Sequence, residues 1–397
     1  MSLEVPEGFR LTGVHCGVKQ DPAKNDLMLV VCDQPTVAAG VYTKNLVFAA
    51  PVELDRQRTP SADIRTVVAN SGNANSCTGE RGLEDAHTMA RLAAQACGVQ
   101  ADQALVMSTG LIGEYLPMDN IAAGITDATA KLGNDPACLE AAARGIMTTD
   151  KAHKLSARQL TLGGRPVQIT GMVKGAGMIG PHMATMLGLV MTDAALTPAD
   201  AQAALEAAVD QSFNCISVEG HMSTNDTVLL LASGARGTEP LAGNELAAFT
   251  QGLREVCEDL ARGIAAGGEG AKHLITLDVC GTRTKSDAHQ IAKTVANSLL
   301  VKTSVAGADP DWGQILSAAG YAGVPMDPAL VDVFINDMLV CRQGGPVEFD
   351  EAAVSASMRD STEINIRLQL GEGVANCRYW TCDITAEYVR FNTDLHT

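Results

Sequence analysis

The chain has 397 residues and a net charge of −17, and 46% of its residues are hydrophobic but only 4% aromatic. This composition argues against disorder and indicates a large core of small aliphatic side chains, while the negative charge disfavours nucleic acid and anionic membrane surfaces as partners. No charged-then-apolar leader and no apolar run of about 18 residues is present, so we expect a cytoplasmic protein, neither secreted nor membrane-spanning.

Short apolar runs alternate with amphipathic segments along the chain, and this alternation predicts an α/β protein. We expect strands at residues 26–32, 37–42, 62–68, 104–107, 167–173, 186–191 and 274–281, and a strand, a polar turn and a second strand within 212–234. Apolar residues at helical spacing predict helices at 82–98, 118–132, 135–145, 197–212, 241–266 and 286–298. No internal repeat, low-complexity run or linker divides the chain.

The eleven cysteines are scattered without a C-x-x-C pair, and the eight histidines form no H-x-x-x-H pair. An odd number of unclustered cysteines is typical of free thiols in a reducing cytosol, not of a disulfide framework or a zinc site. We therefore expect neither a metal nor a cofactor.

Two segments rich in Gly, Ser and Asn follow predicted strands. Residues 69–75 (ANSGNAN) are turn-forming by composition, because asparagine and glycine readily satisfy tight connections. Residues 108–113 (STGLIG) contain Thr109 and Gly110, which present a hydroxyl and exposed backbone N–H groups at a strand end. Those are the donors that an oxyanion hole needs, although from these residues alone a turn is the favoured explanation.

Residues 174–194 (KGAGMIGPHMATMLGLVMTDA) place one threonine where a glycine-rich loop becomes a buried strand. Thr185 follows the small residue Ala184, and this placement suits a threonine that cleaves its own chain. Its hydroxyl would attack the carbonyl of Ala184, and hydrolysis would leave a free α-amine on Thr185. With a pKa of about 8, that amine can act as the base for its own hydroxyl. Most Ala-Thr pairs at a strand start are structural, so the pair alone does not establish this chemistry.

The same stretch closely resembles the self-cleavage region of the ornithine acetyltransferase family, the glutamate N-acetyltransferases of the ArgJ type in arginine biosynthesis. The resemblance runs from Gly8 to the C-terminus and includes the segments ANSGNAN, STGLIG, KGAGM (174–178), STNDT (223–227), GEGA (268–271) and GADPDWG (307–313). It implies a four-layer α-β-β-α sandwich of the DmpA/ArgJ type with a smaller α/β portion. It also implies self-cleavage into an α chain (1–184) and a β chain (185–397), assembled as a cytosolic α2β2 heterotetramer.

The resemblance assigns roles to single residues. It makes Thr185 the nucleophile, with cleavage between Ala184 and Thr185, and gives Thr109 and Gly110 the oxyanion role. The substrate contacts that it implies are Thr148, Lys174, Thr185, Glu269, Asn392 and Thr397. Segments 69–75 and 223–227 are expected to support the site. The local alternatives are a helix cap at Thr148, a solvated ammonium at Lys174 and a surface turn at Glu269.

Some positions depart from the family pattern. After TTD (148–150) the chain has Lys-Ala-His-Lys in place of T-x-P-K, Lys272-His273 replaces Thr-Lys, and His182 stands where the family commonly has Asn. The first departure puts the shape of that loop in doubt more than the role of Thr148. His182 is expected to be a loop residue and not a base, because the amine of Thr185 fills that role.

The implied reaction moves the acetyl group from N2-acetyl-L-ornithine to L-glutamate through an acetyl-threonine, with ping-pong kinetics. Use of acetyl-CoA as a second donor, which would make the enzyme bifunctional, rests on family analogy alone. Two other classes stay open. One is an N-terminal-nucleophile hydrolase or aminopeptidase of the same architecture, in which water replaces glutamate. The other is a non-catalytic binding protein that kept the fold.

Overall fold

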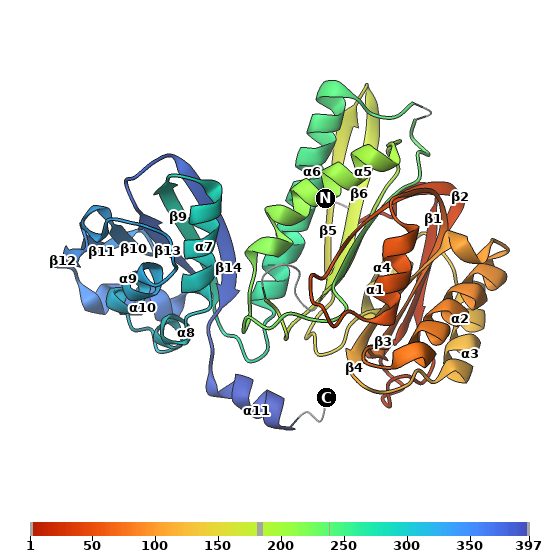
Figure 1. The fold of residues 1–397 in the computed structure, drawn as a ribbon, viewed down its shortest axis with the longest axis horizontal. Helices are drawn as coiled ribbons and strands as arrows, with labels where there is room; N and C mark the ends of the chain where they lie inside the picture. The colour runs from red at the N-terminus through yellow and green to blue at the C-terminus, as the bar shows by residue number, and fades with distance from the viewer. Residues whose placement is uncertain (1–2, 181–185, 238, 395–397) are drawn as a thin grey trace.

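The computed structural model describes residues 3–180, 186–237 and 239–394. In this part of the chain a larger and a smaller body lie side by side (Figure 1). The larger body contains an eight-stranded sheet in the order β4-β3-β2-β8-β7-β6-β5, with β1 paired to β2. Its strands are β1 (Phe9–Val14), β2 (Leu27–Tyr42), β3 (Ser61–Asn73), β4 (Ala104–Leu111), β5 (Lys154–Leu162), β6 (Arg165–Lys174), β7 (Leu187–Thr192) and β8 (Thr227–Ala232).

One long strand, β2, connects the two halves of this sheet. Its first part pairs with β1 and β3, and its last part, from Val37, pairs with β8. The register against β3 shifts between Val31 and Thr36, so the strand is irregular at this point. The two strands predicted at 26–32 and 37–42 are therefore one strand, because the exposed residues 33–35 between them stay extended.

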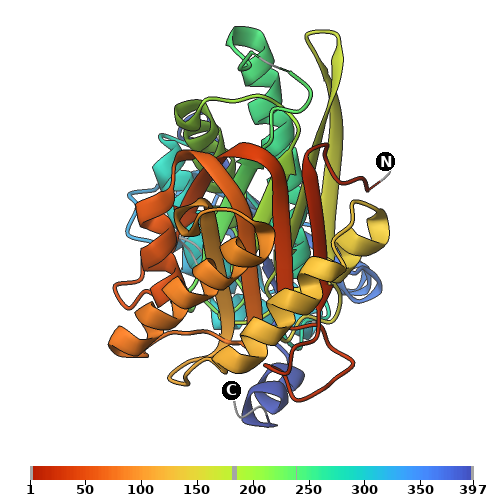
Figure 2. The same ribbon diagram turned by 90° about the vertical axis from the view of Figure 1, so that its right-hand side faces the viewer.

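The larger body is a four-layer α-β-β-α sandwich, as the resemblance implied. Alternate residues of a strand face opposite sides, so Leu29 packs under α1 (Ala50–Arg58), α2 (Gly79–Cys97) and α3 (Met118–Ala130), whereas Val30 faces inward. Figure 2 shows helices of this layer over the first strands. The inner core joins β1–β4 to β6–β8, with α4 (Pro136–Gly145) packed against it. Helices α5 (Pro198–Asp210) and α6 (Gly243–Ala266) cover the opposite face.

The smaller body has a six-stranded mixed sheet in the order β12-β11-β10-β13-β9-β14. Its strands are β9 (Leu274–Thr282), β10 (Asp332–Ile335), β11 (Met338–Arg342), β12 (Gly345–Pro346), β13 (Glu363–Gln369) and β14 (Ala375–Cys382), and its helices are α7 (Lys285–Ala296), α8 (Leu299–Ala306), α9 (Trp312–Gly320) and α10 (Glu351–Asp360). One buried cluster continues from α5 and α6 into this body, and the Tyr379 hydroxyl donates to the Ile216 carbonyl across the junction at 3.0 Å.

The chain ends in a helix, α11 (Ala386–Asp394), which leaves β14 and lies apart from the smaller sheet (Figure 1). The sequence pattern does not predict this helix, nor β1, α1, β5, α8, α9, α10 and β10–β14. These elements are short, polar on one side or interrupted, so their hydrophobic pattern is weak. No described helix has the length and apolar character that crossing a membrane requires.

Two further local predictions are wrong. Residues 70–73 were expected in a turn, but β3 runs on to Asn73, because Asn70, Ser71 and Gly72 pair in parallel with residues 108–110 of β4. A first strand was expected after residue 212, but Phe213–Cys215 forms a short 3-10 helix. Neighbouring chain segments, not local composition, decided both cases.

Candidate functional site

The predicted cleavage pair lies outside the described residues, and so does one predicted substrate contact. Ala184 and Thr185 fall within 181–185, and Thr397 falls within 395–397. The chain on both sides of 181–185 is described. Lys174 at the end of β6 pairs with Leu187 at the start of β7. The two ends of the segment that carries the predicted cleavage site therefore leave neighbouring strands at the same edge of the sandwich.

Lys174 and Thr109 meet at this edge, although they come from opposite β layers. Met107 of β4 and Met172 of β6 both belong to the inner core. Side chains two residues further along each strand point to the same side, which brings Thr109 and Lys174 face to face. Lys174 Nζ donates to Thr109 Oγ1 at 2.9 Å, and both residues are only 2% exposed. Lys174 is thus a buried cation, and the solvated-ammonium alternative is wrong.

Gly110 follows in a conformation that only glycine adopts without strain. Its φ is +135°, and a Cβ at this position would lie 2.2 Å from the carbonyl carbon of Gly72 and 2.4 Å from the backbone nitrogen of Asn73. The backbones of β3 and β4 therefore approach each other closely beside Thr109. The predicted turn at 108–113 begins as strand β4, which ends at Leu111.

A buried carboxylate, Asp150, organises the cation side of the site. Its Oδ1 accepts from Lys154 Nζ and, at 2.8 Å, from the backbone N–H of Gly175, while its Oδ2 accepts from the N–H of Thr148 at 3.2 Å. Burial is the largest single influence and raises the pKa of Asp150, but Lys154, Lys174 and the hydrogen bonds from Lys154 and Gly175 together bring this pKa below its usual value. Burial lowers the pKa of Lys174, and Asp150 opposes that change.

Thr148 contacts this network through its backbone N–H and not through its side chain. Its backbone N–H donates to Asp150 two residues later and forms a local turn. Helix α4 already ends at Gly145 with Ile146 as its C-cap, so the alternative of a helix cap at Thr148 is wrong. Its side chain is half-buried. In the sequence, Asp150 is only a potential cap. Only the fold places Lys154 and Lys174 around Asp150, where its negative charge interacts with both lysines.

Glu269 and Asn392 are brought together as predicted contacts of one site. Glu269 Oε1 accepts from the Thr149 hydroxyl at 2.7 Å, and Oε2 accepts from Asn392 Nδ2 of α11 at 3.2 Å. The Glu269 backbone N–H donates to the Ala176 carbonyl at 2.9 Å. A Cβ on Gly177 would come within 2.4 Å of the Glu269 carboxylate, so this carboxylate lies directly against the loop that follows Lys174. Glu269 is therefore not a free surface turn.

Two acids that the sequence analysis did not single out, the half-buried Glu219 and the buried Asp226, hold backbone groups on the two sides of segment 181–185. Glu219 Oε1 accepts from the N–H of Ile179 at 2.6 Å, and Asp226 Oδ1 accepts from the N–H of Met186 at 3.1 Å. Burial raises the pKa of each carboxyl to about 8. The STNDT match points to the Asp226 segment, but nothing local shows that this aspartate is fully buried.

The polar segments at 69–75 and 223–227 support the site through hydrogen bonds, as expected. Asn225 Nδ2 donates to the carbonyls of Ala74 and Ser108 at 2.6 and 2.8 Å. Ser108 in turn donates its hydroxyl to Asn70 Oδ1 at 2.6 Å. These bonds hold β3 to β4 next to Thr109. They also hold both strands against the turn that precedes β8.

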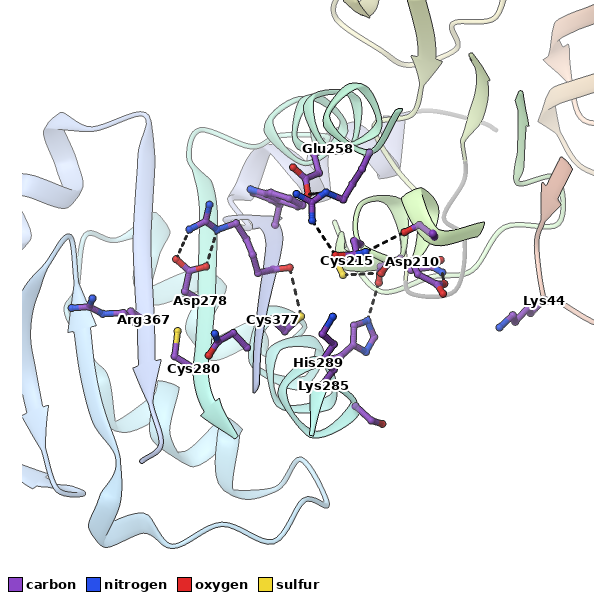
Figure 3. A pocket seen from close by; sticks show the side chains of 18 residues that line it. Lys44, Asp210, Cys215, Glu258, Asp278, Cys280, Lys285, His289, Arg367 and Cys377 are labelled. Atoms are coloured by element: carbon purple, nitrogen blue, oxygen red, sulfur yellow. Dashed lines mark hydrogen bonds and ion pairs between the residues drawn. The ribbon is translucent and has the colours of Figure 1, made fainter. Parts of the chain in front are cut away.

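A separate groove of about 1080 Å³ lies between the larger and the smaller body (Figure 3). Its walls carry ion pairs, such as Arg378 with Asp278 at 2.8 Å and Arg254 with Glu258 at 3.5 Å. None of the predicted site residues that the structure describes lines this groove. In the described part of the chain, no three His, Cys, Asp or Glu side chains are grouped to hold a metal ion.

Comparison with known proteins gives a family match over nearly the whole chain. The ArgJ family model matches residues 10–397. A relative from Rhodopirellula baltica is 44% identical over 392 residues, covering 98% of this chain and 95% of its own length. One from Symbiobacterium thermophilum is 46% identical over 398 residues, covering 100% and 98%. Both are named arginine biosynthesis bifunctional protein ArgJ.

A solved structure shows the same likeness. The arginine biosynthesis bifunctional protein ArgJ from Bacillus halodurans aligns with a TM-score of 0.51 and 37% identity. The alignment covers 52% of this chain and 98% of the Bacillus chain, so the solved chain is about half as long as this one.

Proposed function

The chain belongs to the ArgJ family, and on this premise we propose that it is an acetyltransferase of arginine biosynthesis. It moves the acetyl group from N2-acetyl-L-ornithine to L-glutamate. The observation that carries the proposal is the buried contact between Lys174 Nζ and Thr109 Oγ1, beside the strand that begins two residues after Thr185. A buried cation and a free hydroxyl hydrogen suit an anionic substrate and a developing oxyanion.

The chemistry begins with Thr185 as the first residue of the cleaved β chain. Its α-amine takes the proton of its own hydroxyl, and the oxygen attacks the acetyl carbonyl. Because Lys174 donates to Thr109 Oγ1, the hydrogen of the Thr109 hydroxyl is free to donate to the oxyanion. The Gly110 backbone N–H supplies the second donor. Collapse returns the proton to the leaving α-amine of ornithine and leaves an acetyl ester on Thr185.

Glutamate then binds in the place of ornithine. Its α-amine attacks the ester, Thr185 leaves as the alcohol, and N-acetylglutamate is released. Both amino acids carry an α-carboxylate, which Lys174 binds with help from Thr148, while Glu269 and Asn392 receive the δ-ammonium group of ornithine. Thr397 completes the pocket. The contact between Glu269 and Asn392 supports this division, because it places an acceptor beside the loop that leads from Lys174.

The named relatives are called bifunctional, and we extend this to the present chain. In the second activity acetyl-CoA acetylates Thr185, and glutamate accepts the acetyl group by the same second half-reaction. No cofactor takes part. The cleaved chains, 1–184 and 185–397, remain together and assemble as α2β2 in the cytoplasm. The half-length chain of the Bacillus halodurans structure supports the division of the chain in two.

Intact mass spectrometry and one assay test the proposal together. Purified protein should consist of two chains that begin at the native N-terminus and at Thr185, while the Thr185→Ala variant should remain a single 41.4 kDa chain without activity. With N-acetylornithine, the cleaved enzyme should form N-acetylglutamate and ornithine only when glutamate is present. Release of free acetate at the same rate without glutamate would instead identify a hydrolase, and an uncut but folded wild-type chain would reject the mechanism.

A further inference from the structure

One more lysine, Lys19, contacts the candidate site and has no role in the proposed mechanism. It belongs to the loop between β1 and β2, and its ammonium group donates to the carbonyls of Asn25 and Met147, both at 2.7 Å. Two residues after Met147, the Thr149 hydroxyl donates to Glu269 at 2.7 Å. This short segment therefore contacts a cation at its first residue and a carboxylate at its last.

The stem of Lys19 packs against the strand end that lies beside the proposed oxyanion residues. A Cβ on Gly72 would lie 3.1 Å from Lys19 Cγ, and a Cβ on Gly110 would overlap the Gly72 backbone. Lys19 thus reaches this edge of the sheet from the β1–β2 loop, whereas Lys174 reaches it from β6 and contacts Thr109. Two lysines from distant parts of the chain approach the same strand end.

The loop that carries Lys19 is fixed by a buried aspartate. Asp26 is 0% exposed, and its carboxylate accepts the backbone N–H groups of Cys16, Gly17 and Lys19 at 2.6, 3.1 and 2.9 Å. Because these bonds hold the backbone of the loop, the position of Lys19 is set before a substrate binds, which reduces the entropy that binding must lose.

The Lys19 ammonium group has a hydrogen left for a ligand. An ammonium group has three N–H donors, and among the described residues two carbonyls accept from it. Lys19 is half-buried, and burial lowers its pKa to about 8. Lys174 and Lys24 act in the same direction, whereas Asp26 and Asp150 oppose the shift. A half-buried cation with an unused donor suits a carboxylate ligand.

The two proposed substrates make opposite demands on the site. N-acetylornithine and glutamate both carry an α-carboxylate, but the side chain of the first ends in an ammonium group and that of the second ends in a carboxylate. Glu269 suits the ammonium group and repels the carboxylate, since placing like charges side by side is unfavourable. Lys174 is already assigned to the α-carboxylate, so the side chain of glutamate needs a separate cation.

We propose that Lys19 binds the side-chain carboxylate of the acceptor glutamate through its unused ammonium hydrogen. The inference deepens the proposed function and rests on it. Ornithine and glutamate share the α-carboxylate contact at Lys174, while their side chains bind at Glu269 and at Lys19 respectively. These two charges lie at opposite ends of segment 147–149, so neither substrate places its side chain against a like charge.

The Lys19→Met variant tests this assignment with two acceptors, glutamate and glutamine. Glutamine is as long as glutamate but has a neutral side-chain amide, so the ratio of kcat/KM for the two acceptors measures recognition of the carboxylate. We expect the wild type to prefer glutamate by roughly 10- to 100-fold, the range for a hydrogen bond to a charged group. Lys19→Met should lose this preference, while KM for N-acetylornithine and the burst of ornithine released without an acceptor stay as in the wild type.

Lys24→Met is the matched control. Lys24 is exposed in the same loop, and its charge also acts on Lys19. Its substitution removes one positive charge from the loop but leaves the contact between Lys19 and Met147 in place. Lys24→Met should keep the wild-type preference for glutamate and the wild-type KM values. An equal loss of preference in both variants would show a general effect of charge and would overturn the assignment.

The assignment is also wrong if the wild type does not prefer glutamate, if Lys19→Met keeps that preference, or if KM rises equally for both substrates. In each case acetyl transfer from N-acetylornithine persists and the proposed function stands. If the wild type transfers no acetyl group to either acceptor, the proposed function fails first. Should Lys19→Met not fold, Lys19→Gln decides instead. It keeps a donor for the Met147 carbonyl but has no charge, so a retained preference for glutamate would overturn the assignment.

Discussion

At the scale of single residues, two fully buried lysines show how surroundings decide a role. Lys174 donates to Thr109 and is placed beside Asp150, at the end of the strand that leads to the predicted cleavage segment. Lys302 of α8 donates to Thr381 Oγ1 and the Cys382 carbonyl, both at 2.5 Å, within the smaller body. Burial lowers the pKa of both lysines. Their chemistry is alike, but only Lys174 lies at the candidate site.

Replacing Lys174 by Met should lower kcat/KM by roughly 10²–10³-fold, the range seen when a charge-stabilising donor is removed from an acyl-transfer site. The substitution removes the carboxylate-binding ammonium and the bond that orients the Thr109 hydroxyl. Steady-state assays of cleaved protein provide the measurement. Lys302→Met is the control, and it should destabilise the fold but keep kcat/KM. Equal losses in the two variants would show that Lys174 is only a structural lysine.

At the scale of elements, the close approach of β3 and β4 forms the wall that carries Thr109. The parallel pairing of residues 70–72 with 108–110 requires a glycine at position 110, because a Cβ there would overlap the Gly72 backbone. The same pairing extends β3 through part of the ANSGNAN segment. A segment of turn-forming composition therefore forms the end of a strand, and its backbone groups pair with the neighbouring strand β4.

The Gly110→Ala variant should lose at least about 2 kcal/mol of unfolding free energy, because its Cβ would overlap the Gly72 backbone and its φ is unfavourable for alanine. Urea unfolding measures this loss, and activity should fall with it. Gly113→Ala separates strain from overlap. Gly113 has a φ of +87°, but a Cβ added there would meet no atom within 4 Å, so only about 1–2 kcal/mol should be lost. Equal losses would contradict a steric role for the strand contact.

At the scale of the whole molecule, the candidate site gathers parts that are distant in the chain. Thr149 follows α4, Glu269 follows α6, and Asn392 belongs to the terminal helix α11, and all three meet at one carboxylate. A backbone contact closes this arrangement, since a Cβ on Gly270 would lie 2.4 Å from the Tyr388 nitrogen. The terminal helix therefore completes one side of the site without contributing to either sheet.

Removing residues 386–397 should leave both bodies folded and self-cleavage intact, because α11 adds no strand to either sheet. Loss of the Asn392 bond to Glu269 should raise KM for N-acetylornithine by roughly tenfold, since a hydrogen bond to a charged group is worth on the order of 1.5–3 kcal/mol. Thermal melting and steady-state kinetics check the two parts. The single variant Asn392→Ala removes the same bond and should raise KM by a similar factor. An unchanged KM in the truncated enzyme would show that α11 is not part of the substrate-binding site.

Much of the fold could be predicted from local pattern. The helices α2, α3, α4, α5, α6 and α7 and the strands β4, β6, β7, β8 and β9 lie where apolar periodicity placed them, within a few residues. That periodicity directly reflects which side of an element is buried. The short strands of the smaller body and α11 lack a clear apolar periodicity, and they were missed for that reason.

By itself, the sequence determined the family, the α/β class and the choice of Thr109, Lys174, Glu269 and Asn392 as candidate site residues, because long motifs are properties of residue order. Only the tertiary structure decided that β2 joins two β layers, that Lys174 is buried against Thr109, and that Asp226 holds the start of β7. Those facts depend on which distant segments pack together. Burial and charge neighbours, which set the behaviour of a lysine or a carboxyl, are properties of that packing and not of the local chain.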